Sequence, residues 1–106
     1  MRGVSNRIET LQNLLAQSPG DSRFRYMLAS EYKNGGQLAE AVVEFNTIIA
    51  GDPNYGPAYY HGGQTLEKLN KIDEARAMYA AGIEATRRSG DAHTRGELEA
   101  ALSILG

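Results

Sequence analysis

The chain has 106 residues with no cysteine, and 13 acidic against 11 basic residues leave a net charge of -2. The length fits a single domain, the absence of cysteine excludes disulfides and thiolate metal sites, and the near-neutral charge lacks the basic footprint of a nucleic-acid-binding protein. Charges interrupt the apolar residues of 1–17, unlike a signal peptide, and no apolar run approaches the roughly 18 residues of a membrane span, so we expect a cytoplasmic protein without membrane attachment.

Six segments with apolar residues at helical spacing follow one another, separated by residues that interrupt helices. They cover residues 4–17, 22–34, 38–50, 56–69, 73–88 and 92–105. Asp21, Asp73 and Asp91 stand where N-caps are expected. Gly35 or Gly36 stands where the second segment would end. No segment alternates apolar and polar residues with period two, so we predict an all-α fold of about six helices.

The segments repeat when the sequence is shifted by 34 residues. Among the identical residues that then coincide are Tyr26 with Tyr60, Glu40 with Glu74, Ala41 with Ala75, and Ile49 with Ile83. The same shift brings the apolar face of the first segment, including Val4 and Leu15, onto Leu38 and Ile49. Three successive segments therefore share one helical pattern.

This pattern resembles the tetratricopeptide repeat, a helix–turn–helix unit that stacks into a right-handed solenoid. In residues 22–55 the matching positions are Leu28, Ala29, Tyr32, Ala41, Phe45 and Pro53. In residues 56–89 they are Tyr59, Gly63, Leu66, Ala75, Tyr79 and Gly82. The departures are Arg25, Ile48, Gly62 and Arg87. The resemblance implies a half repeat at 4–19, repeats at 22–55 and 56–89, and a capping helix at 92–105, all within one domain.

Two neighbouring glycines, Gly62 and Gly63, lie inside a predicted helix, where each costs about 1 kcal/mol relative to alanine. The resemblance implies that Gly63 lets two helix backbones approach closely. Gly62 stands where leucine is usual, and two explanations are open. In the first, which we favour, residues such as Tyr59, Leu66 and Tyr79 fill the space and Gly62 makes a tight contact. In the second, the site is a shallow void.

Catalytic and metal sites are weakly supported by the sequence. The stretch HGGQT at 61–65 lacks the preceding strand and the lysine of a phosphate-binding loop. The two histidines, His61 and His93, lie on different predicted helices, and we expect His61 to face solvent. No nucleophile with a base and an orienting partner is apparent. We therefore expect no enzyme activity, no cofactor, no metal and, without a basic groove, no nucleic-acid partner.

One face of the first helix of each repeat carries the candidate binding residues, because positions three and four apart share a face. They are Arg23, Tyr26, Ser30 and Lys33 in 22–34, and Tyr60, Gln64 and Glu67 in 56–69. In the resembled family this face lines a concave groove for peptides or partner helices. The resemblance thus implies a non-catalytic protein-interaction module or scaffold that binds a protein or peptide.

The roles of the two tyrosines and of the whole module have alternatives. Tyr26 and Tyr60 are repeat-equivalent, so we expect them to be neighbours that anchor a peptide. Equally, they could only cover the edge of the core. Tyr26 and Ser30 also replace the lysine and asparagine of a carboxylate clamp, which argues against binding of a chaperone tail. The alternative function is a self-associating structural module or accessory subunit, although we expect a monomer rather than a homodimer.

Overall fold

The residues that interrupt helices lie between the helices, as predicted. All six predicted helices are present in the computed structural model, which describes residues 3–106. They are α1 (Gly3–Gln17), α2 (Ser22–Asn34), α3 (Leu38–Gly51), α4 (Gly56–Lys68), α5 (Ile72–Ser89) and α6 (Ala92–Leu105). No strand occurs among the described residues, which confirms the predicted all-α class. Side chains are described from residue 6 onward, so the prediction for the side chain of Val4 lies outside them.

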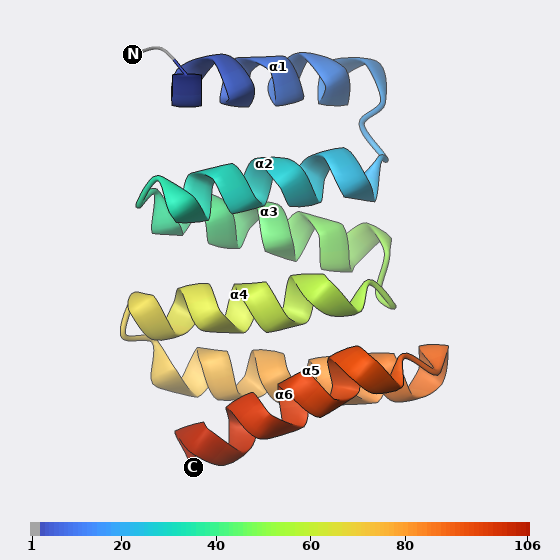
Figure 1. The fold of residues 1–106 in the computed structure, drawn as a ribbon. Helices are drawn as coiled ribbons and strands as arrows, with labels where there is room; N and C mark the ends of the chain where they lie inside the picture. Colours follow the sequence, from blue (N-terminus) through green and yellow to red (C-terminus); the bar gives the residue numbers. More distant parts are fainter. Residues whose placement is uncertain (1–2) are drawn as a thin grey trace.

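The helices stack in chain order, with α1 and α6 at opposite ends of the stack (Figure 1). Each helix packs against the next one along the chain, and α4 also packs against α6. This arrangement places α2, α4 and α6 in one layer and α1, α3 and α5 in the other. The result is a right-handed solenoid of antiparallel helix pairs that measures 39 × 28 × 19 Å.

Two of the three predicted N-caps, Asp21 and Asp91, are N-caps in the structure. The Asp21 carboxylate accepts hydrogen bonds from the backbone N–H groups of Arg23 and Phe24 at 2.9 and 3.1 Å. The Asp91 carboxylate accepts one from the N–H of Thr94 at 3.1 Å. These bonds satisfy donors in the first turns of α2 and α6 that have no partner within the helix.

The remaining helix ends differ in part from the prediction. Asp73 is not an N-cap, because Asn70 turns the chain with a φ of 62° and α5 already begins at Ile72. Asp73 therefore lies in the first turn of α5, where its charge still complements the helix dipole. At the end of α2, Gly35 is the C-cap and Gly36 follows with a φ of 82°, as the glycine pair predicts.

The packing of α4 on α5 depends on two contacts in which a tyrosine lies directly on a glycine. The ring of Tyr79 in α5 covers Gly63 of α4, and Tyr59 in α4 covers Gly82 of α5. A methyl group on Gly63 would overlap the Tyr79 ring, and one on Gly82 would lie 2.5 Å from the β-carbon of Tyr59. Gly63 therefore permits the close approach that the sequence predicts.

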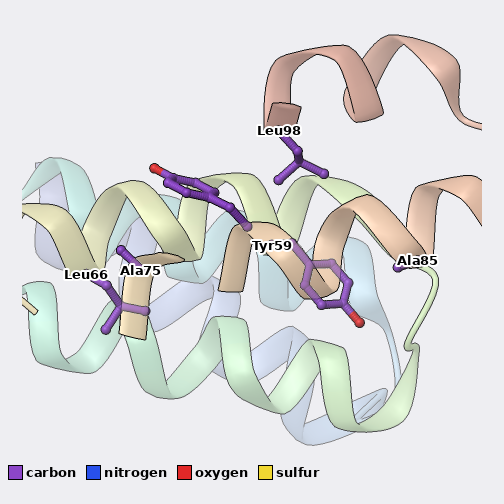
Figure 2. Close-up of a cluster of buried hydrophobic side chains, with 6 residues drawn as sticks. Tyr59, Leu66, Ala75, Ala85 and Leu98 are labelled. Carbon is purple, nitrogen blue, oxygen red and sulfur yellow. The ribbon is translucent and has the colours of Figure 1, made fainter. Parts of the chain in front are cut away.

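A buried cluster surrounds these contacts and extends to α6. Figure 2 shows Leu98 reaching from α6 towards the hairpin formed by α4 and α5. The cluster consists of Tyr59, Leu66, Ala75, Tyr79, Ala85 and Leu98. Because α4, α5 and α6 share this cluster, the layer that contains α4 and α6 is fixed by the core beneath it.

The structure corrects the favoured explanation of Gly62. A methyl group there would lie 3.4 Å from the Met78 ε-carbon and 3.4 Å from the Phe45 β-carbon, which is ordinary van der Waals contact. The neighbours are thus Met78 and Phe45, rather than Tyr59, Leu66 and Tyr79. The tight contact belongs to the adjacent Gly63, and the backbone at Gly62 has room for a side chain of one carbon.

Arg25, which departs from the family pattern, makes the same kind of contact with the preceding loop as Tyr59, the residue at the equivalent position of the next repeat. The Tyr59 hydroxyl donates to the carbonyl of Pro53 at 2.7 Å. The Arg25 guanidinium donates to the carbonyl of Pro19 at 3.0 Å and forms an ion pair with Glu44 at 2.7 Å. In both repeats, therefore, a side chain of the first helix ties that helix to the loop before it.

We predict opposite effects on stability for alanine at the two neighbouring glycines. Gly62→Ala should raise the free energy of unfolding by about 0.5–1 kcal/mol, because alanine is the better helix former and fits the available space. Gly63→Ala should lower it by about 1–3 kcal/mol, because the methyl group displaces the Tyr79 ring. Urea unfolding of both variants checks this. Destabilisation by Gly62→Ala at an unchanged slope would restore the tight-contact explanation.

Candidate functional site

Lysine 33 of α2 and the residues opposite it on α4 join the two helices in the layer formed by α2, α4 and α6. The Lys33 ammonium donates to the Gln64 side-chain oxygen at 3.0 Å. It also lies 3.2 Å from Nδ1 of His61. An ammonium group has no acceptor, so Nδ1 accepts and the neutral imidazole carries its proton on Nε2. Lys33 and Gln64, both predicted site residues, thus meet across two repeats.

Histidine 61 is half-buried, so the expectation that it faces solvent is wrong. Its ring centroid lies 5.7 Å from that of Tyr26, 5.2 Å from that of Tyr60 and 6.4 Å from that of Phe45. Tyr26 and Tyr60 are therefore linked through His61, rather than by the direct pairing that their repeat-equivalence suggested. The repeat pattern could not predict this link, because His61 contacts residues of the neighbouring repeat.

The other predicted site residues lie at different depths. Arg23 is exposed at the start of α2, with its guanidinium 3.7 Å from the Asp21 carboxylate. Ser30 is half-buried, one turn beyond Tyr26. The Glu67 carboxylate accepts a hydrogen bond from the hydroxyl of Tyr79, which holds it in place. Arg23 is thus exposed at the start of α2, whereas Glu67 in the last turn of α4 is bonded to a core tyrosine.

Two hollows open on this layer. The first, which we call the α4–α6 hollow, has a volume of about 360 Å³. It is lined by Tyr60, Gln64, Glu67, Tyr79, Glu97, Ala100, Ala101 and Ile104. The second, the lysine hollow, has a volume of about 260 Å³ and is lined by Lys33, Gln64, Glu67 and Lys68. Gln64 and Glu67 line both hollows, so together they form one groove, which runs along α4 between α2 and α6.

Helix α6 contributes to this groove, which its predicted role as a capping helix does not indicate. Glu97, Ala100 and Ile104 of α6 line the α4–α6 hollow. Ile104 offered the available signal, because it is apolar yet falls outside the face formed by Leu98 and Leu102. In the structure 87% of Ile104 is exposed.

Burial and neighbouring charges shift several pKa values in the groove. Burial, and secondarily the charge of Lys33, lowers the pKa of His61. Burial, and secondarily the charge of Lys68, lowers the pKa of Lys33. Burial, helped by Tyr55 and Glu97, raises the pKa of Tyr26. The negative charge of Glu97 in α6 therefore acts on groups in both α2 and α4, although burial dominates each shift.

The chemical groups in the groove suit non-covalent binding, through apolar contacts and electrostatic attraction. Among residues 3–106, no group of three or more histidine, aspartate or glutamate side chains is placed to hold a metal ion. No helix of that part of the chain is long and apolar enough to cross a membrane. What the groove offers is an exposed aliphatic side chain, aromatic rings, the amide of Gln64 and charges of both signs.

Comparisons with known proteins agree on one family. A sequence model of the tetratricopeptide repeat matches residues 35–102. A tetratricopeptide repeat domain protein from Salinibacter ruber is 34% identical, with a TM-score of 0.78 over 82% of this chain and 88% of that one. A protein from Bordetella parapertussis is 28% identical, with a TM-score of 0.79 over 92% and 85%. The type III secretion translocator chaperone SycD from Yersinia enterocolitica shares the fold, at 16% identity and a TM-score of 0.87 over 97% and 72%. No curated protein matches the chain.

We predict that His61 makes folding stability dependent on pH. Its pKa is lowered in the folded state, so the unfolded chain binds the proton more readily. Stability should therefore be fully retained above the ordinary histidine value of about 6.5 and fall as the pH drops below it. Urea unfolding at about pH 7.5 and 5.5 measures the difference, which His61→Gln should reduce. His93→Gln, at the exposed histidine of α6, is the control, and an effect confined to that variant would contradict the assignment.

Proposed function

The chain belongs to the tetratricopeptide repeat family, whose members are generally non-catalytic protein-interaction modules, and we propose that it binds a peptide or partner helix in the groove along α4. The groove would take a protein segment rather than nucleic acid, because it carries charges of both signs. We further propose that binding needs no cofactor and takes place in the cytoplasm. On this proposal the division into a half repeat, two repeats and a capping helix describes the scaffold that presents the groove.

One observation carries the proposal: a large aliphatic side chain stands exposed on the wall of a hollow. Ile104 is 87% exposed beside the α4–α6 hollow of about 360 Å³. Burial of its surface by a bound segment would be favourable, at roughly 25 cal/mol per Å². Tyr60 offers an adjacent ring, and Gln64 supplies an amide to fix the orientation of a bound main chain.

The predicted site residues take different parts in this proposal. Tyr60, Gln64 and Glu67 would touch the segment directly, because they line the α4–α6 hollow. Lys33 would touch it in the lysine hollow. Tyr26 instead packs on Phe45 and Tyr55, with ring centroids 6.2 and 5.7 Å away, so it supports the groove from beneath. Arg23 and Ser30 would contact only a segment that extends along α2.

We predict that Ile104→Ala weakens binding of groove ligands about tenfold or more, as loss of an apolar anchor does. The ligands are peptides selected from a random library on the wild-type chain, and fluorescence anisotropy measures their affinity. Val43→Ala is the matched control, because Val43 is an apolar residue of α3 that is 60% exposed and lies in the other layer. Circular dichroism checks that both variants fold. Equal losses in the two variants, or no selectable peptide, would refute the proposal.

Self-association is a second candidate function, favoured by an apolar hollow at the end of the stack that contains α1. This hollow has a volume of about 340 Å³ and is lined by Asn6, Arg7, Thr10, Leu11, Leu14 and Met27. Met27 is 44% exposed there, and α1 packs chiefly against α2. A second copy of the chain, packed end to end, would cover this surface and close the assembly as a two-fold dimer.

We predict a monomer in sedimentation at tens of micromolar. The polar side chains of Asn6, Arg7 and Thr10 line the apolar hollow, so that association would have to desolvate them. Met27→Glu should then leave the sedimentation coefficient unchanged. A stable wild-type dimer that Met27→Glu dissociates would instead establish the second candidate.

A further inference from the structure

The two hollows of the groove differ in charge. The α4–α6 hollow is lined by two carboxylates, those of Glu67 and Glu97, and by no lysine or arginine. The lysine hollow is lined by Lys33 and Lys68, with Glu67 at the shared boundary. The sign of the charge therefore changes across α4, from the side next to α6 to the side next to α2. A bound segment would meet negative charge next to α6 and positive charge next to α2.

Both carboxylates of the α4–α6 hollow can accept further hydrogen bonds. The Glu67 carboxylate receives one bond, from the Tyr79 hydroxyl, and a carboxylate has about four acceptor sites. The Glu97 side chain is 44% exposed, and its carboxylate lies 3.7 Å from Nε2 of His93 on the same helix. Glu67 is held in place by the core, whereas Glu97 remains accessible from the hollow.

The rest of the lining is suited to an aliphatic chain. Ala100, Ala101 and Ile104 line the same hollow as the two glutamates and present small or apolar surfaces, and Tyr60 presents a ring. Lysine and arginine side chains combine a long apolar stem with a cationic end. The stem would lie along α6, while the cationic end would meet carboxylates whose attraction is strengthened by partial exclusion of water. A guanidinium group could in addition bind a carboxylate through two parallel hydrogen bonds.

We propose that the groove selects protein segments that place an apolar side chain and a lysine or arginine side chain on one face, two residues apart if extended or three to four apart if helical, with both side chains in the α4–α6 hollow. The inference rests on the proposed function, because it specifies the partner of the same groove. The apolar side chain packs on Ile104 and Tyr60, and the basic group lies between Glu67 and Glu97. An acidic segment is disfavoured there because like charges would be brought together with little water between them.

The test compares peptide pools selected from one random library on three chains: wild type, Glu97→Lys and Glu99→Lys. Glu99 is an exposed residue of the same helix that does not line the hollow. The two variants have the same net charge because each replaces one glutamate with lysine. Wild type and Glu99→Lys should enrich lysine or arginine two, three or four residues from an apolar residue, and Glu97→Lys should lose this enrichment. A wild-type-selected peptide should bind Glu97→Lys about tenfold or more weakly and Glu99→Lys nearly as well as wild type.

The outcomes separate this inference from the proposed function. Selected peptides that lose affinity on Ile104→Ala but show no basic enrichment, or show acidic enrichment, would overturn the inference and leave the proposed function standing. A library that yields no peptide on the wild-type chain would overturn both. If circular dichroism shows that Glu97→Lys is unfolded, Glu97→Gln replaces it, with Glu99→Gln as its control. Retained basic enrichment in the pool selected on Glu97→Gln would then contradict the role of the Glu97 charge.

Discussion

The contact of the Tyr79 ring with the backbone of Gly63 fixes the relation between the core and the groove. The same tyrosine whose ring sets the distance between α4 and α5 donates its hydroxyl proton to Glu67 on the groove side of α4. One side chain thus determines both the helix spacing and the position of a groove carboxylate. Burial and the neighbouring Glu67 raise the pKa of Tyr79, so the hydroxyl stays protonated and remains a donor. A side chain at Gly63 would therefore change both the helix spacing and the position of the Glu67 carboxylate.

The two repeats reach similar geometry with different residues. Tyr59 lies over Gly82 and bonds to the Pro53 carbonyl, whereas Arg25 bonds to the equivalent carbonyl of Pro19 and pairs with Glu44. An arginine can replace a tyrosine here because the shared requirement is a donor that reaches the preceding loop. What this position requires is therefore a hydrogen bond to the preceding loop, and either an arginine or a tyrosine can supply it.

Helix positions could be predicted closely from the sequence, because apolar spacing and chain-breaking residues are local signals. The failure at Asp73 has a local cause too, since the left-handed turn at Asn70 ends before the aspartate that the prediction favoured. The groove was only partly predictable. Lys33 could be assigned to the correct face, but the burial of His61 and the exposure of Ile104 depend on contacts between helices from different repeats. Such contacts leave no periodic signal within one helix.

The linear stack also shapes how the protein opens. Packing is local, so α4 is held by α3, α5 and α6, while α1 packs chiefly against α2. In such arrays stability is approximately a sum over neighbouring interfaces, and separate parts open at different free energies. Backbone amides of α1 would then exchange with solvent after a partial opening that leaves the groove intact. Loss of the terminal helix and loss of the binding surface are, in this architecture, separate events.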